Sequence, residues 1–194
     1  MNTTELETLT LISEFNKTEN PFRQWSVSDI FVPKELKELA IACNPKSSLE
    51  LGCGLGRFSS YLGKQGIKAT GIDFSQKAIE KAEKRAIHNP FQPTFMTGDV
   101  THLNTIDEQF DMSFDIGYFQ YLSEDEQQQY VSEIARLLPH GAIHLLWAMD
   151  SLLSDLKFSL EYIIKMFEKK FQLVSSTSSR RRLMPSHWYW FVRK

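Results

Sequence analysis

Hydrophobic and polar residues alternate along this chain in two periods, which predicts helices interleaved with short strands. Apolar residues at helical spacing predict helices at residues 4–16, 34–43, about 57–66, 75–86, 124–138 and 152–169. Short apolar runs predict strands at residues 49–51, 67–72, 94–97, 110–116, 142–148, 171–178 and 187–193. Ser75 is placed to cap one helix, and Ser123 with Glu126 forms a capping box for another.

The order of these elements predicts an α/β fold. Five strands alternate with helices, which implies right-handed crossovers and a parallel sheet. The last two strands follow each other without a helix between them and so predict a closing hairpin with one antiparallel strand. We expect a single globular domain, in which residues 1–33 form an N-terminal helix and a lid segment and residues 34–194 form the main body.

A glycine-rich stretch follows the first predicted strand. Gly52, Gly54 and Gly56 occupy alternate positions, and a helix can begin directly after Gly56. Without a Cβ, the backbone can turn sharply and let a ligand lie directly on it. The N–H groups at the start of the helix point back toward that ligand. This strand–loop–helix unit predicts a ligand site at the carboxyl ends of the strands.

The spacing of the glycines indicates which ligand the loop holds. Dinucleotide enzymes use G-x-G-x-x-G, whereas this chain has G-x-G-x-G with Glu50 two residues before the first glycine. A carboxylate there would repel a pyrophosphate and suit a ligand that carries an ammonium and a sulfonium. The stretch resembles motif I of the class I S-adenosylmethionine-dependent methyltransferases. A nicotinamide-dependent oxidoreductase is the rival with the same fold.

The resemblance covers residues 34–194 and implies a particular sheet. That sheet is doubly wound, seven-stranded and mostly parallel, in the order 3-2-1-4-5-7-6, with strand 7 antiparallel and helices on both faces. It also implies S-adenosylmethionine as cofactor and S-adenosylhomocysteine as product.

The same resemblance places the cofactor at the strand ends. Asp73, at the end of the second strand, would accept the ribose hydroxyls; capping of the next helix is its alternative role. Asp99, with the N–H of Val100, would hold the amino edge of adenine, and Val100 could pack on the ring; a surface turn is the alternative. The expected cofactor-binding residues are Glu50, Gly52, Cys53, Gly54, Gly56, Asp73, Phe74, Asp99, Val100 and Asp115.

Asp115 and Tyr118, at the end of the fourth strand, are the expected catalytic residues. Methyl transfer is an in-line displacement from an activated donor, so the enzyme mainly positions two molecules. A base is needed only if the acceptor must lose a proton. Gly117 would allow close backbone approach, and Tyr118 or Phe119 would flank the ligand. Further candidate bases are Asp150, His144 and His187, although His144 lies in an apolar strand and fits a core histidine better.

The expected acceptor site is formed by Trp25, Tyr118, Arg180, Arg181 and His187. If strand six runs parallel to strand five, the predicted loop 179–185 lies on the ligand side. Its arginines, including Arg182, would then meet a carboxylate or a phosphate of the acceptor; a solvated strand edge is the alternative. The stretch around Trp25 is either a lid or core packing of a loop.

Composition narrows the possible partners. The 194 residues carry a net charge of −2, so no nucleic-acid partner is expected. Two cysteines form no disulfide framework and no metal-ligand spacing is present, so we expect a cytoplasmic protein without a metal. No apolar run approaches the length of a membrane span. We predict a small-molecule methyltransferase, monomeric or homodimeric; methylation of protein or RNA and a non-catalytic, S-adenosylmethionine-binding regulatory domain remain open alternatives.

Overall fold

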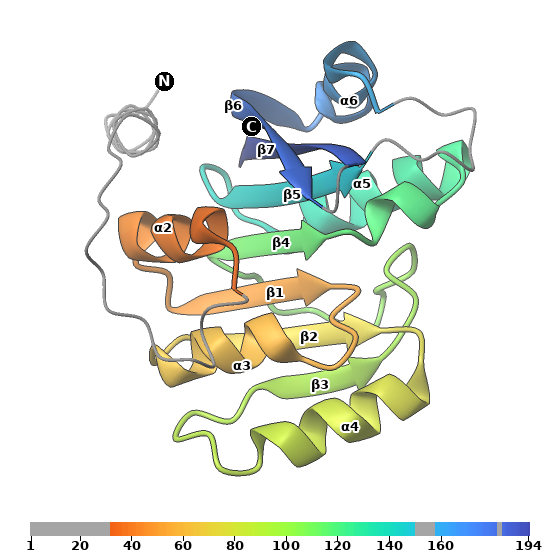
Figure 1. Ribbon diagram of the computed structural model, residues 1–194. Coiled ribbons are helices and arrows are strands. Elements are labelled where there is room, and N and C mark those ends of the chain that lie inside the picture. Colours follow the sequence, from red (N-terminus) through yellow and green to blue (C-terminus); the bar gives the residue numbers. More distant parts are fainter. Residues whose placement is uncertain (1–31, 150–157, 182–183) are drawn as a thin grey trace.

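A computed structural model describes residues 32–149, 158–181 and 184–194. They form one seven-stranded sheet with the order β3-β2-β1-β4-β5-β7-β6. β1 to β5 pair in parallel, and β7 pairs antiparallel with both β5 and β6. The sheet predicted from the sequence resemblance is therefore confirmed, and the carboxyl ends of β1, β2 and β4 meet at one edge (Figure 1).

The strands are slightly displaced from their predicted bounds. They are β1 (Ser47–Leu51), β2 (Lys68–Asp73), β3 (Thr94–Thr97), β4 (Met112–Ile116), β5 (Ile143–Met149), β6 (Phe171–Arg181) and β7 (Met184–Arg193). The largest difference is in the closing hairpin, where the predicted loop 179–185 is mostly strand. Arg180 pairs with Pro185 and Arg181 with Met184, so the ladder continues almost to the turn.

The helices are α2 (Lys34–Cys43), α3 (Arg57–Lys64), α4 (Gln76–Ala86), the short 3₁₀ helix η2 (Phe119–Tyr121), α5 (Glu124–Leu137) and α6 (Leu160–Phe167). Both predicted caps are present: Ser75 accepts the N–H of Ala78, and Ser123 with Glu126 forms a reciprocal capping box. The predicted helix 152–169 is shorter among the described residues, because the Ser159 side chain caps it and Leu160 is its first residue.

Helices cover both faces of the sheet (Figure 1). On one face, α2 and α3 bury Leu36, Leu39 and Leu62 against residues of β4, β5 and β7. On the other face, α5 and α6 bury a second cluster that includes Tyr130 and Phe167. A third, small cluster joins α4 to β3 and to the glycine-rich loop. The two main clusters fix the sheet rigidly and leave its carboxyl edge to the loops.

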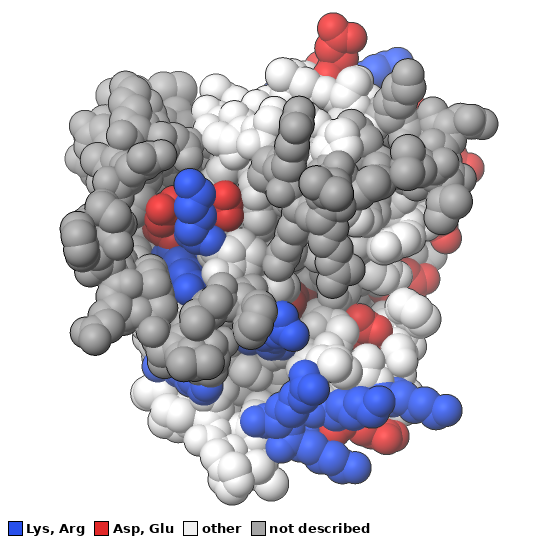
Figure 2. All heavy atoms as spheres, viewed as in Figure 1, with Lys and Arg blue, Asp and Glu red and all other residues white. Residues whose placement is uncertain are grey.

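The surface facing the viewer in Figure 2 carries charges of both signs. Lysines and arginines gather in the lower part of the view, where α4 lies, and α4 contains acidic residues among them (Figures 1 and 2). Mixed charge on one helix is typical of a solvated face. Within the described ranges, no helix is long and apolar enough to cross a membrane, and no group of His, Cys, Asp and Glu could hold a metal ion.

Candidate functional site

The glycine-rich loop is tied to the end of β2 by backbone and side-chain hydrogen bonds. The N–H of Cys53 donates to the carbonyl of Ile72 at 2.8 Å, and the N–H of Gly54 donates to Asp73 Oδ2 at 2.8 Å. Inside the loop, the N–H of Gly56 donates to the carbonyl of Cys53 at 2.9 Å. These contacts hold the loop in one position above the ends of β1 and β2.

The three glycines of the loop have different surroundings. A Cβ on Gly52 would lie 2.5 Å from side-chain atoms of Tyr118, and a Cβ on Gly56 would overlap the ring of Phe95. A Cβ on Gly54, in contrast, would meet no atom of the described residues within 4 Å. Gly52 and Gly56 therefore serve packing of the protein itself, whereas Gly54 borders open space at the carboxyl edge of the sheet.

Glu50 lies beneath this loop, on the face of the sheet that α3 covers. Its Oε2 accepts the N–H of Ser59 at 2.8 Å and the Ser59 hydroxyl at 2.5 Å. Burial raises the pKa of Glu50 to about 8, and the charges of Asp115 and Asp73 add to this rise against the two bonds from Ser59. At neutral pH the carboxyl group of Glu50 is therefore mostly protonated, and it contributes little negative charge beneath the loop.

The burial of Glu50 predicts that the free energy of unfolding of the ligand-free protein falls as the pH rises. The pKa of Glu50 is higher in the folded protein than its ordinary value of 4.5. Its contribution to the free energy of unfolding is therefore complete at low pH and is lost as the pH rises toward 8. We expect Glu50→Gln to leave the free energy of unfolding nearly unchanged at pH 5 and to raise it by about 3 kcal/mol at pH 8. Urea unfolding at both pH values measures this, and equal differences between the two proteins at both values would contradict it.

Asp73 uses its carboxylate to organise the loop and the start of α4. Besides the N–H of Gly54, it accepts the N–H of Ser75 through Oδ1 at 2.9 Å. Ser75, and not Asp73, caps α4. Asp73 therefore does not cap α4 itself. It accepts a hydrogen bond from the backbone of Ser75, the residue that does. Each carboxylate oxygen has a second lone pair, so a ligand could still be accepted there.

Two aromatic side chains stand beside the loop. Phe74 follows Asp73 directly and is 68% exposed, which is unusual for a phenylalanine in a folded domain. The ring of Tyr118 lies 6.3 Å from that of Phe74, centroid to centroid. Burial, followed by the charges of Asp99, Asp73 and Asp115, raises the pKa of Tyr118 above its ordinary value. Tyr118 therefore keeps its proton at neutral pH and can donate a hydrogen bond, which argues against its acting as a general base.

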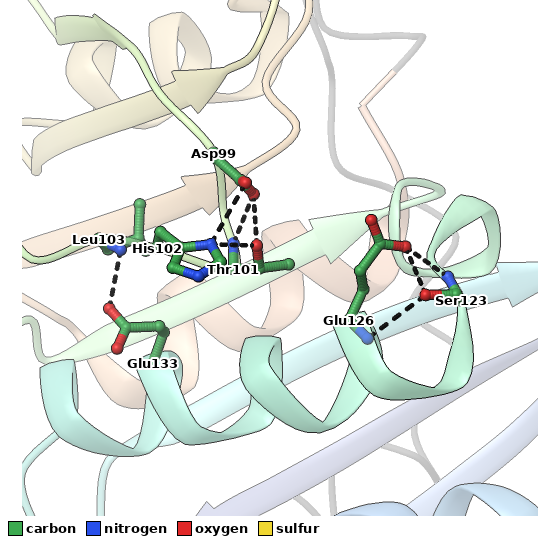
Figure 3. Close-up of polar contacts among 7 residues, drawn as sticks. All are labelled: Asp99, Thr101, His102, Leu103, Ser123, Glu126 and Glu133. Atoms are coloured by element: carbon green, nitrogen blue, oxygen red, sulfur yellow. Dashed lines mark hydrogen bonds and ion pairs between the residues drawn. The ribbon is translucent and has the colours of Figure 1, made fainter.

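Asp99 lies just beyond β3 and remains open to solvent. Its Oδ1 accepts the N–H of Thr101 at 2.9 Å and the Thr101 hydroxyl at 2.7 Å, and His102 Nδ1 lies 3.4 Å from Oδ2 (Figure 3). The bonds from Thr101 lower the pKa of Asp99. The side chain is still 59% exposed, so an ionised acceptor is fixed in place and accessible to a ligand.

Two expected cofactor residues can act only through their backbone. The side chain of Val100 is buried in the cluster beneath α5, so it is not available to pack on an adenine ring. The side chain of Cys53 is buried with Ile79 and Phe95 against α4. In both cases the residue after a tight turn points into the core, and only its main chain faces the carboxyl edge.

Asp115 is not placed as the sequence predicted. Its side chain is 0% exposed. Its Oδ1 accepts the N–H of Tyr118 at 2.7 Å, while Oδ2 accepts the N–H of Phe119 at 2.9 Å and the Tyr130 hydroxyl at 3.1 Å. The enclosed carboxyl has no surface that could contact cofactor or acceptor. The structure therefore favours a positioning role for Asp115, which holds the loop after β4, over a catalytic or cofactor-binding role.

The residues around Tyr118 also differ from expectation. A Cβ on Gly117 would lie 3.1 Å from Trp147, so the glycine admits a tryptophan ring rather than a ligand. Phe119 is fully buried and packs on Tyr130, Phe158 and Phe167. Of the residues expected to flank the ligand here, only Tyr118 keeps that position among the described residues.

The expected acceptor residues are described only in part. Trp25, Asp150 and Arg182 lie outside the described residues. The backbones of Arg180 and Arg181 end β6, and because β6 runs parallel to β5 they lie at the carboxyl edge, as predicted. His187, on β7, pairs with Ala148 near the end of β5, and its Nδ1 lies 3.4 Å from the Ser178 hydroxyl.

Sequence reasoning missed two residues that support the site. Ser59 fixes the carboxyl of Glu50 from the first turn of α3, a pairing that no spacing rule indicates. Gln120 of η2 is nearly buried, and its Oε1 accepts the N–H of Met149 at 2.7 Å. This bond links the loop after β4 to the end of β5. A glutamine between two aromatic residues after a strand was the available signal.

The comparisons with known proteins agree with this geometry. A family model described as a methyltransferase domain matches residues 49–141. An uncharacterized methyltransferase of Schizosaccharomyces pombe is 30% identical over 89 residues, which cover 46% of this chain and 61% of that protein. Phosphoethanolamine N-methyltransferase 1 of Triticum aestivum is 33% identical over 98 residues, covering 50% of this chain and 20% of that protein. The chain thus spans about three fifths of the first of these relatives.

A solved structure extends the likeness to the whole fold. Magnesium protoporphyrin IX methyltransferase from Synechocystis PCC 6803, with bound S-adenosylmethionine, superposes with a TM-score of 0.69 at 18% identity and covers 100% of this chain and 99% of its own. This match, the matching methyltransferase-domain model and the confirmed strand order agree with the glycine-rich loop. Residues 49–141 are therefore similar to a methyltransferase domain, and the chain shares its fold with an S-adenosylmethionine-dependent methyltransferase.

Proposed function

We propose that this protein transfers a methyl group from S-adenosylmethionine to a small-molecule acceptor. The observation that carries the cofactor assignment is the open space over Gly54 beside the carboxyl group of Asp73. A Cβ on Gly54 would meet nothing among the described residues within 4 Å.

The residues at this edge fit the cofactor by type and position. Asp73 offers lone pairs beyond the two N–H groups it accepts, and Asp99 is ionised and exposed. Phe74 and Tyr118 offer neighbouring aromatic rings beside the loop. Aromatic faces attract a cation that lies over them. When bound, S-adenosylmethionine supplies a methyl group on a sulfonium that is already activated for displacement.

The contribution of the protein's own residues is positioning. Asp73 and Asp99 would fix the nucleoside, Gly54 would let the ligand lie on the backbone, and Tyr118 would hold the reacting end by a donated hydrogen bond. Positioning alone can supply a large part of the rate in such a displacement. Since Asp115 is enclosed and Tyr118 keeps its proton, these residues support an acceptor that needs no strong base.

Two features support a small acceptor. Two of the relatives, by their names, methylate small molecules, phosphoethanolamine and magnesium protoporphyrin IX. In this chain, Arg180 and Arg181 end β6 at the ligand edge. We propose that they, with Trp25, Tyr118 and His187, border the acceptor site and meet an acidic group on the acceptor.

A methyl-transfer assay tests the proposal. We expect label from S-adenosylmethionine to pass to a low-molecular-weight acceptor in a panel of phosphorylated amines and aromatic acids, and not to added protein or RNA. Calorimetry in the same buffer should show micromolar binding of S-adenosylhomocysteine and none of NAD. Label found only in protein or RNA would overturn the acceptor assignment, and NAD binding equal to that of S-adenosylhomocysteine would overturn the cofactor assignment.

A further inference from the structure

Four polar side chains form a continuous hydrogen-bonded chain inside the core, between the sheet and α5. The hydroxyl of Ser113 lies 2.8 Å from His144 Nδ1. His144 Nε2 lies 3.4 Å from the Tyr130 hydroxyl, which in turn lies 3.1 Å from Asp115 Oδ2. All four residues are fully buried. The chain ends at Asp115, the residue that holds the loop carrying Tyr118.

The surroundings of this chain keep the imidazole neutral. Around His144 lie the rings of Phe167, Phe171 and Phe191, contributed by α6, β6 and β7. Burial among them lowers the pKa of His144 to about 3. A neutral imidazole has one N–H and one bare nitrogen, and its two tautomers exchange these roles. His144 can therefore report and transmit a change at Tyr130 without gaining a charge.

Every link in the chain can run in either direction. With Asp115 ionised, the Tyr130 hydroxyl donates to Oδ2, His144 Nε2–H donates to the Tyr130 oxygen, and the Ser113 hydroxyl donates to Nδ1. When a proton from solvent reaches the Ser113 oxygen, the Ser113 hydroxyl proton passes to Nδ1, the Nε2 proton to the Tyr130 oxygen and the Tyr130 proton to Asp115 Oδ2. The O–H of Asp115 then donates to the Tyr130 oxygen, and the Tyr130 hydroxyl donates to the bare Nε2. Nδ1–H then donates to the Ser113 oxygen. One proton is added, none is lost, and His144 changes tautomer.

We propose that Tyr130 and His144 are positioning residues that form a tautomeric relay, by which Asp115 gains or loses one proton while it keeps holding the N–H groups of Tyr118 and Phe119. Oδ1 accepts the N–H of Tyr118 in both states, and Oδ2 has a second lone pair for the N–H of Phe119. The loop that places Tyr118 against Gly52 therefore stays in position across the transition.

Asp115 gains or loses its proton near neutral pH. Burial raises the pKa of Asp115 to about 7, against the opposing effect of the bonds from Tyr118, Tyr130 and Phe119. The titratable groups that face Asp115 are Glu50 on β1, Tyr118 on its own loop, Tyr130 on α5 and, through Tyr130, His144 on β5. The pKa of Glu50 is about 8, so this group stays mostly uncharged while Asp115 titrates.

Nitrogen NMR of the full chain with ¹⁵N-labelled histidine tests the relay. We expect the ring of His144 to remain neutral from pH 5.5 to 8.5, with its proton on Nδ1 at the low end and on Nε2 at the high end. The midpoint near pH 7 should coincide with the titration of the Asp115 carboxyl, followed by its ¹³C shift. This measurement needs only the wild-type protein. A single tautomer at every pH, or a midpoint for His144 that differs from that of Asp115, would overturn the proposal.

Variants separate the relay from ordinary packing. Tyr130→Phe removes the connecting hydroxyl and Asp115→Asn removes the titrating group, so in each the tautomer of His144 should become independent of pH. Glu50→Gln is the matched control, since it removes a neighbouring carboxyl and leaves all four relay residues; the tautomer change should persist there with a midpoint close to that of the wild type. Loss of the change in Glu50→Gln, or its survival in Tyr130→Phe, would refute the relay.

Discussion

We expect that replacing Gly54 with valine abolishes binding of S-adenosylhomocysteine while the protein stays folded. A side chain at this position would enter the space in which no atom of the described residues lies within 4 Å of a Cβ, the space we assign to the cofactor. Gly54 has a φ of 52°, so the variant also pays the cost of a left-handed backbone, about 1–2 kcal/mol. Calorimetry measures the binding, and circular dichroism during thermal unfolding measures the fold.

Gly66 provides the matched control for this substitution. It has a φ of 84°, and a Cβ there would meet only one atom, in Phe91, at 4.0 Å. It lies between α3 and β2, at the sheet edge away from the loop. Gly66→Val should therefore lose a similar amount of stability and keep its affinity. Unchanged affinity in a folded Gly54→Val protein would show that the ligand lies elsewhere.

The strand order was predictable because few topologies satisfy the chain's alternation of strands and helices. Strands separated by helices must be parallel and cross over right-handedly, and the glycine-rich loop marks where the sheet reverses direction. Asp73 and Asp99 could be located for the same reason, since Asp73 ends β2 and Asp99 lies two residues after the end of β3. Their side chains lie at the carboxyl edge as expected.

Side-chain direction after the strands could not be read from the sequence. Val100 and Phe119 each follow a turn whose backbone geometry decides whether a side chain faces the ligand or the core, and both face the core. The side chain of Asp115, at the end of β4, likewise faces the core. Its register partner on β5 is Leu146, which faces the cluster under α5 and α6, so the carboxyl faces that cluster as well. The partner that makes this tolerable, Tyr130, lies 15 residues away on α5.

The hairpin shows a second limit of sequence reasoning. Polar and basic residues at 179–185 predicted a loop, yet the ladder between β6 and β7 continues through Ser179 and Arg180. A polar composition is compatible with a strand that stands at the edge of a sheet, because its side chains can be solvated. Composition alone did not distinguish an edge strand from a loop here.

Among the aspartates, Asp73→Ala should have the largest effect on cofactor affinity. The variant loses an acceptor for the ligand and also the anchor of the Gly54 N–H. We expect a loss of about 1.5–3 kcal/mol, the scale of hydrogen bonds to charged groups, or roughly ten- to a hundredfold in Kd. Asp99→Asn should cost less, since an amide oxygen can still accept a hydrogen bond from an adenine amino group. Titration with S-adenosylhomocysteine compares the two.

An Asp111 variant separates the contribution of Asp73 to ligand binding from its contribution to stability. Asp111 also accepts backbone N–H groups, but at the opposite edge of the sheet. Its Oδ2 accepts the N–H groups of Lys46 and Ser47 at 2.7 and 3.0 Å. These residues lie just before and at the start of β1, at the end of the strand away from the loop. Asp111→Ala should therefore match Asp73→Ala in lost stability and leave Kd unchanged. If Asp111→Ala weakened binding equally, general loosening of the sheet would explain both variants. If Asp99→Asn proved worse than Asp73→Ala, the ligand's main polar contact would lie at the end of β3 and not at the end of β2.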